Sequence, residues 1–402
     1  MKIQQKLIYN FVYVLILSIL IIFFEYNEIN QNFILYFFLT LIFFNLMNSY
    51  DDQNSLWIIL FIGGLILYTF PYLGSLIRGK EPSLIFYSLY LFVCLVVLTG
   101  SGHVKEISVR KSKKIYFYAV VVSLIISVVG LHVWHPIYAG FFSLALVFFD
   151  RICADKSINK KRLLIFSSIF YFLLIYNLIF VWSGFGRLHF LTYLLLPILV
   201  LYQNKVISVQ KWQMIIILPV GLFVGELIRG VDDFSLKNFA SGSVEHHLIL
   251  MNSLLQKKYQ YSFDFKNLFD QFTLTFLNWF PRNIWVEKPE GIGLWFVDVF
   301  LGREGFGDDF SVSLGLWGEH IYLNPNFWFL SGLLAVISII LTSKFLYRIS
   351  FYSKAILLMF QANMLTFFWG GMASFGSRVW WMIIPSIAYI WLERFILKKT
   401  IK

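Results

Sequence analysis

Apolar runs of roughly 15–20 residues, separated by polar connections, recur along most of the chain. A helix that crosses a bilayer needs about 20 predominantly apolar residues, so each run predicts one membrane span. Twelve spans are predicted, at residues 7–24, 33–47, 56–73, 83–99, 115–133, 135–150, 163–182, 188–203, 213–228, 327–343, 355–371 and 378–393. The first run lacks a small-residue cleavage site, so we expect an uncleaved helix rather than a signal peptide. The predicted fold class is an all-α polytopic integral membrane protein.

Lysine and arginine in the short connections predict the orientation of these spans. Twenty-one of the 33 basic residues fall on one side of a twelve-span topology, crowded above all into residues 105–114 and 151–162. The positive-inside rule makes that side cytoplasmic and places both termini there. Connection 48–55 should also face inside, yet it carries no positive charge. The net charge of +11 therefore serves mainly to orient helices, and it gives no case for nucleic acid.

One connection is far longer than the others and divides the chain. Residues 1–228 form a bundle of about nine spans, residues 229–326 a large external segment, and residues 327–402 about three further spans. A structureless loop of this length is improbable in a compact protein. The segment contains amphipathic stretches such as 267–280, so we expect short helices that lie on the outer face.

Arginines on the outer side point to an anionic ligand. Six of the twelve outer-facing basic residues are Arg, and guanidinium offers a fixed fork for phosphate or carboxylate. Arg187, Arg229 and Arg378 lie at outer ends of spans beside glycines, and Arg282 follows Pro281. Together they could line a pocket for the diphosphate of a polyprenyl-linked substrate. The alternatives are pairing with the segment's twelve acidic residues or snorkelling to ordinary lipid phosphates.

Acid–base candidates also gather in the external segment, whereas metal ligands do not. His247 lies in a His-His pair, and Glu319 precedes His320 in Gly-Glu-His. A histidine can relay a proton near neutral pH, and a carboxylate can accept one. No Asp-x-Asp occurs on the outer side and no His-Glu-x-x-His is present, so no metal or cofactor is expected.

Two stretches of the external segment carry a resemblance to a known family. They read Trp-Phe-Pro-Arg-Asn-Ile-Trp-Val-Glu-Lys-Pro at 279–289 and Ser-Val-Ser-Leu-Gly-Leu-Trp-Gly-Glu-His-Ile-Tyr-Leu-Asn at 311–324. The Pro-Arg, Lys-Pro and Gly-Glu pairs resemble the large outer loop of bacterial O-antigen polymerases of the Wzy type. The chain departs from that family after Asn324, where no Asn-Phe-Gly follows.

The resemblance implies a reaction and a location. Such enzymes are glycosyltransferases of the bacterial inner membrane in lipopolysaccharide biosynthesis, and integral-membrane glycosyltransferases of the GT-C type share their layout. They transfer a glycan from undecaprenyl diphosphate to the non-reducing end of another lipid-linked repeat unit at the periplasmic face. The lipid-linked oligosaccharide is then both donor and acceptor, the bilayer is the setting, and a chain-length regulator is a candidate partner.

The same resemblance assigns roles to residues of this chain. Arg187, Arg229, Arg282 and Arg378 would bind the diphosphate or glycan, with Lys288 assisting. Glu319 would be the general base, with His320 or His247 in reserve, and the alternative for Glu319 is a structural carboxylate. Two other functions fit the pattern: an O-antigen ligase, which uses a different acceptor, and a flippase or transporter that makes no bond.

Overall fold

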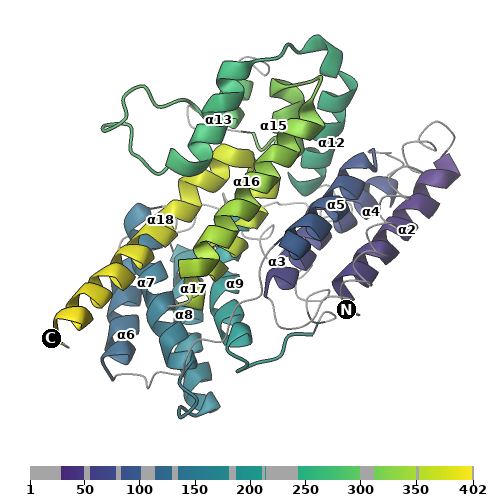
Figure 1. The fold of residues 1–402 in the computed structure, drawn as a ribbon. Helices are drawn as coiled ribbons and strands as arrows, with labels where there is room; N and C mark the ends of the chain where they lie inside the picture. Colours follow the sequence, from purple (N-terminus) through teal and green to yellow (C-terminus); the bar gives the residue numbers. More distant parts are fainter. Residues whose placement is uncertain are drawn as a thin grey trace.

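A computed structural model of the chain describes residues 29–48, 55–77, 83–100, 114–128, 135–180, 187–210, 213, 243–298, 312–349 and 353–400. Every regular element in these ranges is a helix (Figure 1). The predicted spans at 7–24 and 213–228 lie outside the described residues, apart from residue 213. The all-α part of the predicted fold class is confirmed.

The described helices form a bundle with a helical cap at one end. The bundle contains α2 (Ile29–Asn48), α3 (Leu56–Gly64), α4 (Phe70–Ile77), α5 (Ile85–Gly100), α6 (Lys114–Val128), α7 (Pro136–Cys153), α8 (Lys160–Phe180), α9 (Arg187–Gln203), α16 (Trp328–Ile349), α17 (Lys354–Ala362) and α18 (Met364–Thr400). Figure 1 shows α12, α13 and α15 at the opposite end from the C-terminus. We call the end with α12–α15 the outer end, following the orientation that the basic connections predict.

Several helices have the length and composition of membrane spans. Residues Leu56–Leu73, Pro136–Cys153 and Trp328–Ile349 are long and apolar enough to cross a bilayer, and the bent pair α17–α18 adds a fourth candidate. Shorter apolar helices occupy Leu35–Met47, Ile85–Thr99, Ile115–Ser127 and Leu188–Gln203. These helices indicate a multi-pass membrane protein, and the number twelve stays a prediction.

The Leu56–Leu73 span contains a π-helical segment, η1 (Leu65–Thr69). A π-helical turn changes the backbone hydrogen-bond pattern, and in an apolar interior every carbonyl needs a partner. The Tyr36 hydroxyl donates to the Thr69 carbonyl at 2.8 Å, and the Tyr90 hydroxyl donates to the Leu60 carbonyl at 2.6 Å. Tyrosines of α2 and α5 thus stabilise an irregular helix in the core of the N-terminal helices.

The inner ends of α7, α9 and α17 meet at the buried Asp150. Its carboxylate accepts from the Asn204 side-chain amide at 2.8 Å, the Ser353 hydroxyl at 2.8 Å and the Lys354 backbone N–H at 2.7 Å. The next residue of α7, Arg151, forms an ion pair with Glu393 of α18. These contacts place the start of α17 and the last turns of α18 at the same end of the bundle.

We expect Asp150→Asn to destabilise the protein. The substitution replaces one carboxylate oxygen with an N–H₂ group, which faces one or two of these donors and also removes the negative charge. A buried hydrogen bond to a charged group contributes about 1.5–3 kcal/mol. The thermal unfolding midpoint of the protein in detergent should fall. Lys161→Asn, in the exposed first turn of α8, is the control and should leave the midpoint unchanged. An unchanged midpoint in Asp150→Asn would show that this network does not hold the helix ends together.

The chain between α17 and the C-terminus corrects one detail of the predicted topology. We predicted two spans, 355–371 and 378–393, separated by a short loop. A break does lie at Gly371, but residues 372–377 are helical and belong to the segment that runs on to Thr400. The direction changes instead at Asn363, where α17 and α18 meet at 68°, and at Gly371, whose backbone is not helical. The aromatic rings of Phe360 and Phe375 pack 5.4 Å apart, so the chain segments before and after Gly371 lie side by side.

Short helices fill the described part of the external segment, as the amphipathic pattern predicted. They are α12 (Ser243–Gln256), the 3₁₀ turn η2 (Lys258–Gln260), α13 (Phe265–Leu277), α14 (Ile292–Phe296) and α15 (Gly315–Leu323). Asp264 caps α13 by accepting from the Asn267 N–H at 3.0 Å. Leu268, Gln271 and Leu274 form its buried face, which packs against α18.

Candidate functional site

Helix α15 carries the carboxylate that the sequence singled out. Glu319 is 0% exposed, because α15 packs against α12, α16 and α18. Its Oε2 accepts from the backbone N–H of Met372 at 2.9 Å, whereas Oε1 has no hydrogen-bond partner among the described residues. An unpartnered carboxylate oxygen in a buried setting is costly, so a group of this kind points to function.

The break in α18 provides the donor that holds Glu319. Gly371 has φ 74° and ψ −166°, a region that essentially only glycine occupies, and the helix resumes after it. The Met372 N–H therefore has no partner one turn earlier in the helix and donates to Glu319 instead. Before the break, the Ser313 hydroxyl donates to the Trp369 carbonyl at 2.6 Å. Ser313, just before α15, and Glu319, within α15, thus provide hydrogen-bond partners for backbone groups on the two sides of the break.

Glycine is also required at position 371 because of the space available. A Cβ atom built on Gly371 would overlap the carboxylate of Glu319. Close approach between backbone and carboxylate is therefore possible only without a side chain. The sequence places Arg378 after a group of glycines, but the contact of Gly371 with Glu319 is a property of the folded chain.

Burial controls the proton affinity of Glu319. Removal of the carboxylate from water raises its pKa to about 8, and the hydrogen bond from Met372 works in the opposite direction. At pH 7 most of the carboxyl group is protonated, and above pH 8 most of it is ionised. A carboxylate with a pKa near the working pH is well suited to general acid–base chemistry.

His320 occupies a different environment although it is the next residue. Neighbouring positions on a helix point about 100° apart, and the His320 ring packs near Phe272, with centroids 6.0 Å apart. Both ring nitrogens are buried without a hydrogen-bond partner in the described part of the chain. Burial lowers the His320 pKa to about 3, so the ring is neutral at physiological pH. Its role as reserve base stays a prediction.

Arg282 and Lys288 lie in one exposed loop and bind its backbone. The Arg282 guanidinium donates to the carbonyls of Lys288 at 2.7 Å and Pro289 at 3.4 Å. The Lys288 ammonium donates to the carbonyls of Asn278 at 2.6 Å and Phe280 at 2.8 Å. Partial burial, and secondarily Arg282, lowers the Lys288 pKa. Both cations shape the loop, and an anionic ligand would have to share or replace these contacts.

Arg378 lies in the same helix as the break. It is seven positions after Gly371, about two turns along the same face of α18. Arg378 is close enough to Tyr193 of α9 for the two side chains to interact electrostatically. The Tyr193 ring in turn packs against His189 at 4.8 Å and Tyr138 at 5.3 Å. Sequence analysis did not single out Tyr193 or Tyr138, because their neighbourhood is created by packing of α7, α9 and α18.

The other predicted site residues cannot be placed beside these groups. Arg187 begins α9 and His247 lies in α12, but their side chains are outside the described part of the structure, as is all of Arg229. The structure therefore brings Glu319 to the α18 break and gives Arg378 a place on the same helix. The predicted grouping of four arginines stays a prediction.

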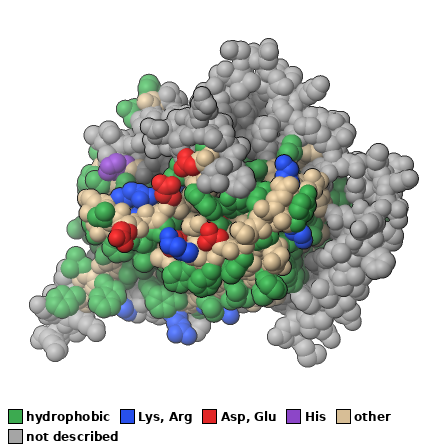
Figure 2. Space-filling view, turned by 90° about the horizontal axis from the view of Figure 1, so that it is seen from above, with side chains coloured by type: hydrophobic (Ala, Val, Ile, Leu, Met, Phe, Trp, Pro, Cys, Tyr) green, Lys and Arg blue, Asp and Glu red, His purple; other side chains and the backbone are tan. Residues whose placement is uncertain are grey.

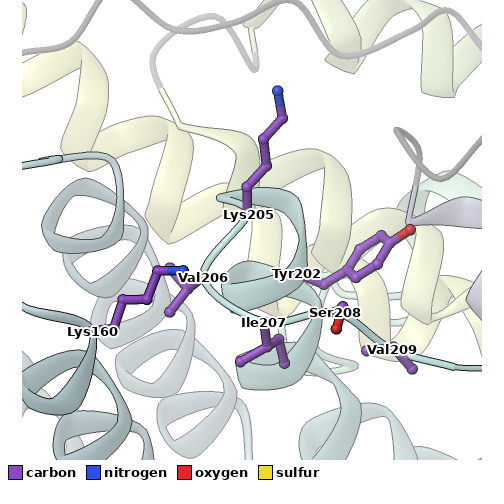
Figure 3. A pocket seen from close by; sticks show the side chains of 7 residues that line it. All are labelled: Lys160, Tyr202, Lys205, Val206, Ile207, Ser208 and Val209. Atoms are coloured by element: carbon purple, nitrogen blue, oxygen red, sulfur yellow. The ribbon is translucent and has the colours of Figure 1, made fainter.

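The described residues form no metal-binding cluster, and a cavity among them is lined by residues other than those of the predicted site. Among the described residues, no group of three or more His, Cys, Asp or Glu side chains could hold a metal ion. A cavity of about 390 Å³ lies near the inner ends of α8 and α9, lined by Lys160, Tyr202, Lys205, Val206, Ile207, Ser208 and Val209. Figure 3 shows that the Lys205 side chain points away from the other lining residues. None of the predicted site residues lines this cavity.

Comparisons with protein-family models, curated proteins and solved structures found no match.

Proposed function

We propose that the protein is a glycosyltransferase that polymerises lipid-linked oligosaccharide repeat units at the outer face of the bacterial inner membrane. The observation that carries this proposal is the buried Glu319, held by the Met372 N–H through one oxygen and unpartnered at the other among the described residues. The resemblance of the external segment to O-antigen polymerases adds the substrate class, a glycan on undecaprenyl diphosphate.

In the proposed reaction, Glu319 accepts a proton from an acceptor hydroxyl. The hydroxyl oxygen forms a bond to the anomeric carbon of the donor glycan, while the bond from that carbon to the diphosphate breaks. Undecaprenyl diphosphate leaves with the bonding electrons, and arginine forks stabilise its charge without a metal ion. Arg378 lies about two turns after the break on the same helix, and Arg187, Arg229 and Arg282 complete the proposed set.

Because Glu319 is buried, the proposed reaction requires a local movement that exposes its carboxylate to the acceptor. Glu319 is 0% exposed, so an acceptor hydroxyl reaches Oε1 only when α15 and α18 separate near Gly371. Catalytic contacts often tighten or form only in the complex with substrate. The non-helical glycine at the break gives this region a natural point of movement.

Glu319 also satisfies the backbone at the α18 break, which offers a purely structural explanation for its burial. Glutamine separates the two explanations, because its amide oxygen can still accept from the Met372 N–H but cannot take up a proton at neutral pH. A structural carboxylate predicts an active Glu319→Gln variant, and a general base predicts an inactive one.

An O-antigen ligase is the same chemistry with another acceptor. Cells that lose a polymerase make lipopolysaccharide with at most one repeat unit, whereas cells that lose a ligase attach none. Electrophoresis of lipopolysaccharide from a deletion strain therefore distinguishes the two activities.

A transporter is a second candidate, and the bend between α17 and α18 favours it. Substrate sites of transporters often lie at interrupted helices with unsatisfied polar groups. At this bend, Gln361 and Asn363 are 0% exposed. Both amide atoms of Gln361 and the Oδ1 of Asn363 lack hydrogen-bond partners in the described ranges, while the Asn363 Nδ2 donates to the Met359 carbonyl. Movement of a lipid-linked unit across vesicles without elongation would favour this candidate over ours.

Arg282→Lys should reduce the rate of elongation. Lysine cannot donate from two nitrogens to the Lys288 and Pro289 carbonyls or hold a diphosphate as a fork. Loss of about 1.4 kcal/mol of transition-state stabilisation corresponds to about a tenfold lower rate. The measurement is the initial rate with a lipid-linked repeat unit, and Lys161→Arg, in the exposed first turn of α8, is the control. Full activity in both Arg282→Lys and Arg187→Lys would remove these arginines from the site.

A further inference from the structure

Exposed aromatic side chains form a continuous ridge at the start of α13. Phe263, Phe265 and Phe269 are 53%, 66% and 61% exposed. Their rings follow one another at 6.2 Å and 6.3 Å between centroids. The opposite face of α13 is the one buried against the bundle. The ridge is therefore the outward apolar face of an amphipathic helix, where exposed phenylalanine is unfavourable in water.

Basic side chains flank this ridge. Lys257 and Lys258 precede it at exposed positions, beside the exposed Tyr259, and Lys266 lies within it. The Lys266 ammonium lies 3.8 Å from the carboxylate of Asp270. Figure 2, which views this end of the molecule, shows Lys and Arg side chains interspersed with acidic and hydrophobic ones. Aromatic and basic residues on one face are typical of helices that lie in a membrane interface.

The backbone fixes the ridge close to the outer end of a candidate span. The Asp264 N–H donates to the Leu323 carbonyl at 3.0 Å, and Leu323 ends α15 shortly before α16 begins at Trp328. Exposed apolar side chains continue along the whole of α16, at Phe327, Leu330, Leu334, Ile337, Leu341 and Phe345. A stripe of this kind on a membrane-spanning helix faces lipid, and the aromatic ridge lies near its outer end.

We propose that Phe263, Phe265 and Phe269, together with Lys257, Lys258 and Lys266, anchor the external segment in the headgroup region of the outer leaflet. The rings enter the boundary between headgroups and acyl chains, and the ammonium groups contact lipid phosphates. The anchor holds α13 at the membrane surface. It does not depend on the proposed transferase activity.

A fluorescent label at position 269 tests the anchor directly. Phe269→Cys is labelled with an environment-sensitive dye and reconstituted in vesicles of phosphatidylethanolamine and phosphatidylglycerol. Cys94 and Cys153 are buried, and the unsubstituted protein measures any background labelling. Leu334→Cys, on the lipid-facing stripe of α16, is the lipid control, and Asn283→Cys, at an exposed polar position, is the comparison.

We expect a lipid-borne quencher to reduce the fluorescence of position 269 to an extent approaching position 334, and aqueous iodide to have little effect. Quenching of position 269 by iodide but not by the lipid-borne quencher would overturn the proposal, since the ridge would then face water. Protection from both quenchers would also overturn it, because another protein copy or another ligand would then cover the ridge.

The lysines are tested in the same assay. Changing Lys257, Lys258 and Lys266 together to Gln should reduce lipid quenching at position 269 in vesicles rich in phosphatidylglycerol. The three side chains are exposed, so the variant should fold normally. Unchanged quenching would remove the lysines from the anchor.

Discussion

Glu319→Gln is expected to abolish elongation while the protein remains folded. General acid–base catalysis contributes about 10²–10⁴-fold to a rate, and glutamine cannot take the proton of the acceptor hydroxyl. The amide oxygen still accepts from the Met372 N–H, so the break in α18 stays capped. The measurement is the initial rate of elongation of a lipid-linked repeat unit, with thermal unfolding of the same preparation as the control for folding.

The pH dependence of the rate gives an independent test of Glu319. Because burial raises its pKa to about 8, the fraction of ionised base, and with it the rate, should rise between about pH 7 and pH 9. A residual rate in Glu319→Gln should lack this rise. An active Glu319→Gln variant with the same pH profile as the unsubstituted protein would show that Glu319 only caps the helix.

The stability of the fold should change with pH in the opposite direction. An ordinary glutamate pKa is 4.5, so between pH 4.5 and about 8 the unfolded chain has lost a proton that folded Glu319 still holds. The free energy of unfolding therefore decreases across this range and levels off above it. Glu319→Gln should remove this contribution, which thermal unfolding at several pH values can measure.

Gly371→Ala is expected to cause the second large effect. Alanine at φ 74° and ψ −166° is strained by about 1–3 kcal/mol, and its Cβ would displace the Glu319 carboxylate. Both the thermal unfolding midpoint and the rate of elongation should fall. If the displaced carboxylate also loses the Met372 N–H, the pH at which the rate rises should increase, a change that destabilisation alone does not produce.

Gly140→Ala is a matched control for this substitution. Gly140 lies inside α7, and a Cβ there would meet Pro385 at 3.4 Å, an ordinary contact. Alanine favours a helix over glycine by about 1 kcal/mol, so the midpoint should be unchanged or higher. Normal activity and stability in Gly371→Ala would contradict the close fit between the α18 break and Glu319.

The apolar periodicity predicted many of the described helices, but it could not predict how the chain turns near its end. The apolar pattern predicts a span that ends at Gly371 and a loop through Gly376 to the next span at 378, and glycine is common in loops. In the structure, α18 is non-helical only at Gly371. Contacts from distant residues support the continued helix, including the Asn278 amide on the Ala373 carbonyl at 2.7 Å and the Trp380 indole N–H on the Thr275 carbonyl at 2.8 Å.

For the candidate site, the sequence predicted the carboxylate itself but not the residues that surround it. The Gly-Glu pair at 318–319 indicated the carboxylate, and the outer segment indicated where it would lie. The hydrogen bond between Glu319 and Met372 joins residues 53 positions apart, so no local pattern could indicate it. The same holds for Arg378 beside Tyr193. For Arg282 and Lys288, the charge of the side chains predicted an anionic ligand. In the folded chain these side chains donate to backbone carbonyls, which the sequence did not predict.

The most direct test of the proposed function is elongation by the purified protein. The protein is reconstituted in vesicles with an undecaprenyl-diphosphate-linked repeat unit, without any other enzyme, and the products are separated by glycan length. The proposal predicts lipid-linked products of two or more repeat units and release of undecaprenyl diphosphate. Products of a single unit only, together with movement of that unit across the vesicle membrane, would contradict it and identify a transporter.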